Sequence, residues 1–132
     1  MPATAGLARI YQKQSILTAS PGQLVLMLYD GALRFMAQAR EAFSLPREDL
    51  RRIEHINSAL LRSQAILEEL RSNLDLERGG EFAANLSRLY DYYIRRLHEA
   101  NLRKEETPVI EIEKFVRDLR DAWAEMLRTV SA

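Results

Sequence analysis

Residues 107–130 read TPVIEIEKFVRDLRDAWAEMLRTV, and no other segment of the chain predicts its secondary structure so clearly. The apolar residues recur alternately three and four positions apart, which places them on one face of an α-helix. They are Val109, Ile112, Val116, Leu119, Trp123, Met126 and Val130. Thr107 is a residue type that caps helix starts, and Pro108 suits the first helical position because its missing N–H costs nothing there. The stretch predicts a long amphipathic helix that follows a Thr107 cap.

The same start signal occurs near the beginning of the chain, in the sequence SPGQ at residues 20–23. Ser20 can cap the first turn, and Gln23 can complete a capping box with it. Residues 24–29 are apolar nearly all round, and a single apolar stripe then continues to Phe43. This helix should end near Phe43, because Pro46 disfavours a helical conformation at the residue before it.

Two more helices are predicted between these segments. The first, from about Glu48 to Ser72, carries a heptad seam; its members are Ile53, Ile56, Leu60, Ser63, Leu67, Leu70 and Leu74. Gly79-Gly80 is the strongest helix stop in the chain, because glycine readily adopts the left-handed cap conformation. The next helix should therefore begin at about Glu81, with its own apolar face formed by Phe82, Leu86, Leu89, Tyr93, Leu97 and Ala100.

Four long helices joined by short connections predict an all-α fold, an antiparallel up-down four-helix bundle. We assign the bundle to residues 20–132. Residues 1–19 are expected to be a flexible N-terminal segment with a short cap helix, because Leu7, Ile10, Tyr11 and Gln14 share one face. Such a short helix is stable only when it packs on something else.

Composition excludes several classes of function. The chain has 132 residues, no cysteine, and 19 basic against 19 acidic residues, so it lacks the net positive charge that general nucleic-acid binding requires. The longest apolar run, residues 24–29, is too short to span a bilayer, and no signal peptide precedes it. We therefore expect a cytoplasmic protein with no nucleic-acid partner and no membrane insertion.

The sequence also lacks the residues of the common active sites. His55 and His98 are the two histidines, and each follows an arginine three positions earlier, so the Glu-x-x-His motif of di-iron bundles is absent. No serine lies in a Gly-x-Ser-x-Gly elbow, and the chain has no phosphate-binding loop. We expect no catalytic residue, no cofactor and no metal ion. An enzyme or metal carrier on a bundle scaffold is a rival that a metal assay would test.

Some apolar and amide side chains lie beyond what the bundle needs for its core. On the second helix, Leu61 lies outside the heptad seam with Ile66 beside it, and Asn57 and Gln64 could hydrogen-bond a foreign backbone. On the third helix Tyr90, Tyr92 and Tyr93 carry aromatic rings on more than one face. Grooves of this kind accept amphipathic partner helices. For any single residue, covering the edge of the core is an equally good explanation; the clustering favours a binding surface.

At the level of motifs, the sequence resembles the flagellar secretion chaperone (FliS) family from Tyr11 to Trp123. The blocks that carry the resemblance are SPGQL at 20–24, MLYDGA at 27–32, LDLERGGE at 74–81, ANLSRLYDY at 84–92, ANL at 100–102 and DAW at 121–123. Phe82 and Tyr93 depart from the family, which typically has a smaller aliphatic residue and often methionine there.

The resemblance implies that the protein binds the disordered C-terminal segment of flagellin, prevents premature polymerisation and keeps flagellin competent for type III secretion. It also implies that the N-terminal cap is displaced by this client, and that the flagellar export gate is a further partner. The predicted partner-binding residues are Ile10, Tyr11, Asn57, Leu61, Gln64, Leu86, Tyr90 and Tyr93. A self-associating structural bundle without a flagellin client is the alternative, and a weak homodimer is compatible with either function.

Overall fold

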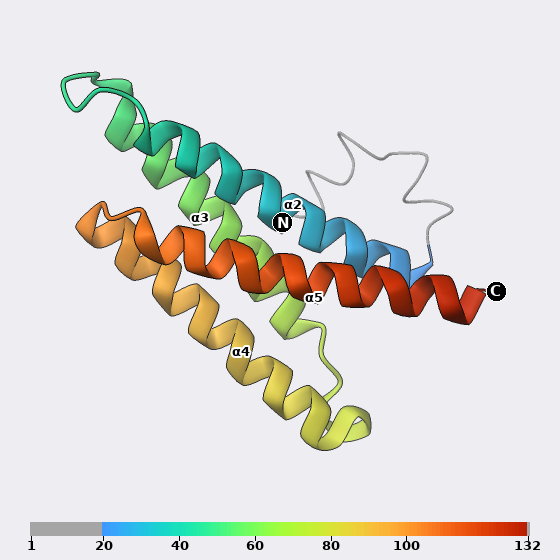
Figure 1. Cartoon of the computed structure of the whole chain (residues 1–132). Helices are drawn as coiled ribbons and strands as arrows, with labels where there is room; N and C mark the ends of the chain where they lie inside the picture. Colours follow the sequence, from blue (N-terminus) through green and yellow to red (C-terminus); the bar gives the residue numbers. More distant parts are fainter. Residues whose placement is uncertain (1–19, 132) are drawn as a thin grey trace.

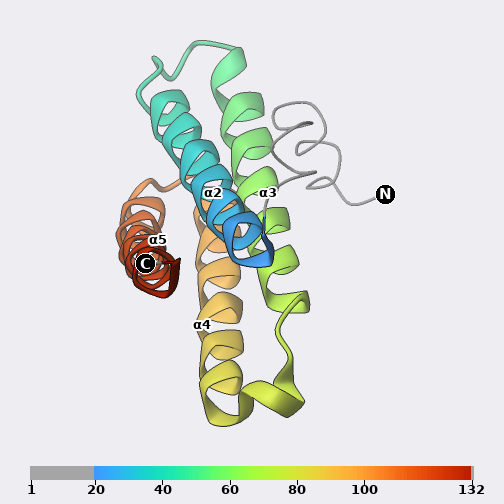
Figure 2. The ribbon, with the colours of Figure 1, turned by 90° about the vertical axis from the view of Figure 1, so that its right-hand side faces the viewer.

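The computed structural model describes residues 20–131, and these form four helices and no strand (Figure 1). The helices are α2 (Pro21–Phe43), α3 (Arg51–Ser72), α4 (Leu76–Arg103) and α5 (Thr107–Ser131). Each helix packs on the next in the chain, and α5 returns to pack on α2, so the four close a ring around one core. Consecutive helices run in opposite directions (Figures 1 and 2). The predicted antiparallel four-helix bundle is confirmed, whereas the assignment of residues 1–19 lies outside the described residues.

The start of α2 has the capping box that the sequence predicts. The Gln23 backbone N–H donates to Ser20 Oγ at 3.2 Å, and the Ser20 N–H donates to Gln23 Oε1 at 3.3 Å. These two bonds satisfy donors that the first turn of a helix leaves unpaired. The helix ends at Phe43, as predicted.

Three other boundaries differ from the prediction. α3 begins at Arg51 rather than about Glu48, because the residues before it form a turn in which the Asp49 carboxylate accepts from the Arg51 N–H at 2.9 Å. α5 already includes Thr107, and the Glu106 carbonyl accepts the bond from Ile110, so Thr107 is not the cap.

The third difference is at the glycine pair before α4. Residues 76–79 form a helical turn of their own, capped by Asp75, whose Oδ1 accepts from the Arg78 N–H at 3.0 Å. Gly80 then breaks the helix with φ +53° and ψ −134°, and the helix continues after it. The predicted break at the glycine pair is confirmed, but α4 begins at Leu76, before the break, and not at about Glu81.

The core is made mainly by the predicted apolar faces. Its fully buried members include Ala32, Met36, Ile56, Leu60, Leu67, Leu97, Val109, Ile112 and Val116. Ser63, the one polar residue on the α3 seam, is also buried, and its hydroxyl donates to the Ala59 carbonyl at 3.1 Å. A local bond of this kind satisfies a buried hydroxyl without any partner from another helix.

Several residues that the apolar pattern assigns to the core are exposed, because the helices do not overlap along their full lengths. The first turns of α4 project past the end of α3, and α5 crosses the bundle obliquely, so that it is seen end-on where α3 and α4 are seen lengthwise (Figures 1 and 2). Residues at these ends keep the apolar pattern but have no neighbour to cover them. They are Ile53, Phe82, Leu89, Met126 and Val130, whose exposed fractions range from 38% to 75%.

Polar contacts fix α5 against α2. Arg40 Nη1 donates to Glu113 Oε1 at 2.7 Å, and Arg120 Nε donates to Asp30 Oδ1 at 2.8 Å. Trp123 Nε1 donates to the Gly22 carbonyl at 2.8 Å, close to the start of α2.

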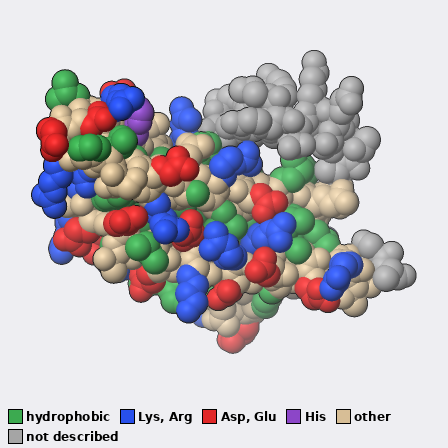
Figure 3. All heavy atoms as spheres, turned by 45° about the horizontal axis from the view of Figure 1, so that its top comes forward, with side chains coloured by type: hydrophobic (Ala, Val, Ile, Leu, Met, Phe, Trp, Pro, Cys, Tyr) green, Lys and Arg blue, Asp and Glu red, His purple; other side chains and the backbone are tan. Residues whose placement is uncertain are grey.

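Elsewhere on the surface, acidic and basic side chains alternate among small apolar patches on the face shown in Figure 3. Within residues 20–131, no helix combines the length and apolar character that crossing a membrane requires.

Candidate partner-binding groove

The predicted binding residues of α3 lie on the side of this helix that faces α4. On α3, Asn57, Leu61, Gln64 and Glu68 recur three and four residues apart, so they share one helix face. Because α3 and α4 are antiparallel, the start of this row lies beside the end of α4 and its end lies beside the middle of α4. We call this row and the adjoining face of α4 the α3–α4 groove.

The first end of the α3–α4 groove is closed by an amide pair. Asn101 Nδ2 donates to Asn57 Oδ1 at 2.8 Å, although the two residues are far apart in the sequence. Lys104 holds the Asn101 group in place, because its Nζ lies 2.5 Å from Asn101 Oδ1 and 2.6 Å from the Asn101 carbonyl oxygen. Burial lowers the pKa of Lys104. Asn57 therefore has a fixed side chain at the mouth of the groove, even though it is exposed.

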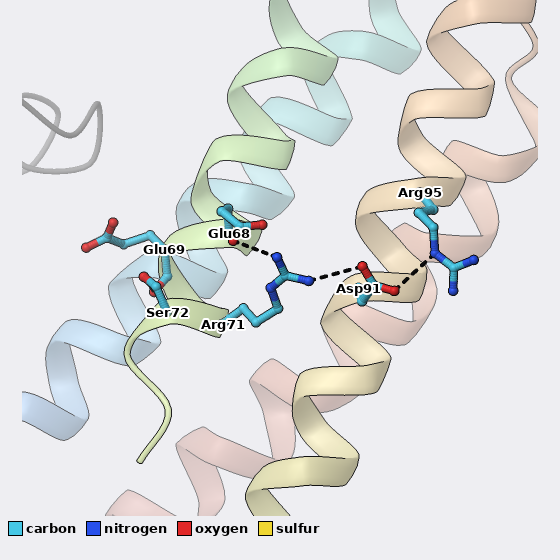
Figure 4. Close-up of polar contacts among 6 residues, drawn as sticks. All are labelled: Glu68, Glu69, Arg71, Ser72, Asp91 and Arg95. Carbon is cyan, nitrogen blue, oxygen red and sulfur yellow. Dashed lines mark hydrogen bonds and ion pairs between the residues drawn. The ribbon is translucent and has the colours of Figure 1, made fainter. Parts of the chain in front are cut away.

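The other end is closed by the chain of ion pairs shown in Figure 4. Arg71 on α3 donates to Glu68 at 2.8 Å and to Asp91 on α4 at 3.0 Å, and Asp91 in turn pairs with Arg95 at 3.1 Å. The hydrogen bond with Glu68 is the main cause of the raised pKa of Arg71. Glu69 points away from this chain of charges (Figure 4). Half-exposed pairs contribute little stability, so their main effect here is to connect α3 to α4 at a set position.

Between these two polar ends, the groove offers one apolar and one polar contact. Leu61 is 50% exposed. One turn further along α3, Gln64 Nε2 is buried, and no acceptor lies within hydrogen-bonding distance among the described residues. A buried donor without a partner costs about 1–3 kcal/mol, so structures rarely retain one without a reason. The groove therefore presents an apolar contact beside a donor that a partner could satisfy.

Tyr90 and Tyr93 lie in the core, not on the surface. Their side chains are only 1% and 4% exposed. The Tyr90 hydroxyl is hydrogen-bonded to the Tyr29 hydroxyl across the bundle, and the Tyr93 ring stacks on Phe115 with 6.0 Å between ring centroids. Burial is the largest cause of the raised pKa values of Tyr29, Tyr90 and Tyr93. The interpretation of these two tyrosines as uncovered surface is wrong, and a contact with a partner would require the bundle to open.

The remaining predicted residues have different positions. Leu86 is partly buried against the core, on the same helix as the two tyrosines. Ile66, predicted as surface beside Leu61, is 2% exposed, because Gly31 of α2 leaves room for it: a Cβ at Gly31 would lie 3.2 Å from Ile66 Cδ1. Ile10 and Tyr11 lie outside the described residues. The structure thus brings only Asn57, Leu61 and Gln64 together in the α3–α4 groove.

Sequence reasoning missed the residues that close the groove. Asn101 is buried and Arg71 and Asp91 are partly exposed, and nothing in the local sequence distinguishes these three residues from solvated side chains. Their roles arise from contacts between helices, and Arg71 and Asp91, for example, are separated by 20 positions in the sequence. Among the described residues, no cluster of histidine, aspartate and glutamate is arranged to hold a metal ion.

With this geometry established, comparison with known proteins identifies the family. The family model described as "Flagellar protein FliS" matches residues 3–130. The chain belongs to the FliS family. It is 39% identical over 119 residues to the flagellar secretion chaperone FliS of Bacillus subtilis, a match that covers 90% of this chain and 84% of the relative. The corresponding protein of Escherichia coli is 37% identical over 129 residues, covering 97% and 91% of the two chains.

A third relative, from Salmonella typhimurium, is 37% identical over 119 residues, covering 90% of this chain and 85% of the relative. All three relatives are named as flagellar secretion chaperones, and the matches extend over nearly all of the bundle. This FliS-family protein is accordingly a chaperone of flagellum biogenesis and protein export, and it is not an enzyme. A chaperone needs a surface that accepts a client of the flagellar system, and the α3–α4 groove is the candidate for that surface.

Proposed function

We propose that the protein binds the C-terminal segment of flagellin in the cytoplasm, prevents its premature polymerisation and keeps it competent for flagellar type III secretion. The family supports a flagellar client. The observation that carries the proposal is the half-exposed Leu61 beside the buried, unpartnered Nε2 of Gln64. A client helix could cover Leu61 with an apolar side chain and supply an oxygen atom to Gln64.

Binding of this kind orders a flexible segment, and this ordering typically consumes about 2–5 kcal/mol of the gross interaction energy. A moderate net affinity follows, which suits a chaperone that must release its client. The sequence contains no nucleotide-binding loop, so release would be either passive or driven by the export machinery. Contact with the export gate is part of this proposal.

The N-terminal segment enters the proposal through Ile10 and Tyr11. In the family resemblance, this segment occupies the client surface until the client displaces it. A chain without residues 1–18 should then bind a flagellin peptide more tightly than the full chain, because nothing competes with the peptide. Weaker binding by the shortened chain would mean instead that Ile10 and Tyr11 contact the client directly.

The groove itself is tested by a pair of matched leucine variants. We expect Leu61→Glu to weaken binding of a synthetic flagellin C-terminal peptide at least tenfold by calorimetry, since it places a charge on the apolar contact. Leu50→Glu introduces the same charge at a leucine that is 94% exposed and precedes α3, so binding should change less than twofold. Both variants should remain helical by circular dichroism. Unchanged affinity of Leu61→Glu would exclude the groove as the client site.

A self-associating bundle is the second candidate, and one observation favours it. Leu76 and Phe82 are 58% and 71% exposed on the turns of α4 that project past α3. If these residues mediate self-association, light scattering should give a mass that rises with protein concentration and is insensitive to flagellin. Phe82→Ser should abolish that rise. A client-binding chaperone would instead change mass only when the flagellin peptide is added.

A further inference from the structure

A concave surface lies between α2 and α3, on the side of α3 away from the α3–α4 groove. It is an open cleft of about 430 Å³. We call it the α2–α3 cleft, and the residues that line it are Gln38, Glu41, Ala42, Leu45, Arg51, His55, Ser58, Ala59 and Arg62. None of these is among the predicted client-binding residues. The function proposed above leaves this cleft unexplained.

The cleft exists because small residues meet where the two helices cross. Ala42 and Ala59 are 4% and 5% exposed and form its floor. At one end the Arg62 guanidinium lies over the Phe35 ring, 5.6 Å from the centroid, and at the other end Arg52 lies at the same distance over Phe43. Cation–π contacts of this kind hold the planar guanidinium group against the ring and leave its N–H edge free for an acceptor.

These two contacts also fix the register of the antiparallel pair. Moving along α2 from Phe35 towards Phe43 corresponds to moving back along α3 from Arg62 towards Arg52. Gln38 therefore lies level with Ser58, and both line the cleft. Starting from the Arg62 end, the cleft presents a cation and then an amide and a hydroxyl group on opposite walls.

The charges of the cleft are not all neutralised within the protein. Arg51 is satisfied by Asp49, which accepts from it at 2.8 and 3.1 Å and has its pKa lowered to about 2, mainly by this contact. Arg62 has no carboxylate within ion-pair distance among residues 20–131. Glu41, the one carboxylate that lines the cleft, lies towards the opposite end, level with His55. The free positive charge is therefore concentrated at the Arg62 end.

We propose that the α2–α3 cleft binds a short acidic polypeptide segment, which places a carboxylate on Arg62 and hydrogen-bonds Gln38 and Ser58. Guanidinium and carboxylate groups form charge-assisted, often bidentate pairs. The cleft volume is at the lower end of the range for ligand pockets, which suits a few residues and not a whole helix. The cleft and the α3–α4 groove lie on different faces of α3, so the proposal is that this partner binds independently of the flagellin segment.

The test uses the full chain and a fluorescein-labelled peptide of ten residues in which glutamate and alanine alternate. We expect saturable binding, with NMR shifts at Gln38, Ser58 and Arg62. Arg62→Glu should weaken this binding at least tenfold. The matched control is Arg103→Glu, an exposed arginine at the end of α4 with the same change of charge, and it should change binding less than twofold.

Two further measurements separate the proposal from general electrostatics. Ser58→Phe, which fills the cleft without changing its charge, should also weaken binding of the acidic peptide at least fivefold. A flagellin peptide should not displace the acidic peptide, since the two occupy different faces. The proposal is overturned if the two arginine variants lose binding equally, or if Ser58→Phe still binds the acidic peptide. It is also overturned if flagellin displaces the peptide, or if inorganic phosphate causes the NMR shifts and the peptide does not. Flagellin binding by Arg62→Glu, measured in parallel, reports on the α3–α4 groove separately.

Discussion

The unpartnered amide of Gln64 gives a prediction in which stability and binding change in opposite directions. Replacing it with methionine keeps the length of the side chain and removes the buried donor. An unsatisfied buried donor costs about 1–3 kcal/mol, and methionine adapts well to irregular packing. We therefore expect Gln64→Met to raise the free energy of unfolding by about 1–2 kcal/mol.

In a chain of this length, 1 kcal/mol corresponds to roughly 3–5 °C in melting temperature, so Tm should rise by about 3–10 °C. Circular dichroism or calorimetry would measure this shift. The same variant should bind a flagellin peptide about tenfold more weakly, which corresponds to the loss of about 1.4 kcal/mol for one hydrogen bond.

Gln38→Met is the matched control, because Gln38 is exposed and has no buried unsatisfied atom. Its Tm should change by less than about 2 °C, in line with surface substitutions of up to about 0.5 kcal/mol. If Gln64→Met leaves Tm unchanged or lowers it, the amide is satisfied in solution and the argument fails. If Tm rises while peptide affinity is unchanged, the donor costs stability but has no role in the client contact.

Three further predictions concern the scaffold. Arg40→Met should lower the free energy of unfolding in urea by about 2–3 kcal/mol, because it leaves the buried Glu113 carboxylate unpaired. This is less than the roughly 3–5 kcal/mol of a fully buried pair, since Arg40 is half exposed. Adding Glu113→Leu to the same chain should recover most of the loss, and no recovery would contradict the pairing. Gly80→Ala should cost about 1–2 kcal/mol, since Gly80 has φ +53°, and a neutral result would refute this conformation. Tyr90→Phe should cost about 1–3 kcal/mol by leaving the Tyr29 hydroxyl unpaired, with the double Phe variant closer to the wild type. Because burial raises the pKa of both tyrosines in the folded state, their contribution to stability is complete below pH 10 and should fall as pH rises above it, which thermal unfolding between pH 9 and 12 would detect.

The helices could be predicted from sequence wherever the signal is local. Ser20 and Gln23 are close enough in the chain to form their capping box without help from the rest of the fold, and both ends of α2 agree with the prediction. The errors concern properties set by neighbouring helices. Phe82 and Leu89 continue the apolar pattern of α4, but whether a residue is covered depends on how far the next helix extends. The periodicity of apolar residues predicts which face of a helix is buried, but it does not predict how far the neighbouring helix extends along that face.

The candidate site was only partly predictable for a related reason. Leu61, Asn57 and Gln64 could be found because they share a face outside the heptad seam. From the sequence Tyr90 is equally available, yet it is packed in the core and hydrogen-bonded to Tyr29, 61 residues away. The sequence predicts the direction in which each side chain leaves its own helix. The packing of all four helices decides which of these side chains are buried.

The positions on α3 lead to one more conclusion about how the protein could work. Asn57, Leu61 and Gln64 face the α4 side, whereas Ser58 and Arg62 face the α2 side, and the core positions lie between them. A rigid helix with two separate outer faces can contact two polypeptides without either blocking the other. If both proposals hold, the affinity of the acidic peptide should be the same with and without bound flagellin peptide, because linkage requires coupling to be reciprocal and none is expected through a well-packed core. A clear change in either affinity would show that α3 moves when the client binds, and the two sites would then have to be treated as one.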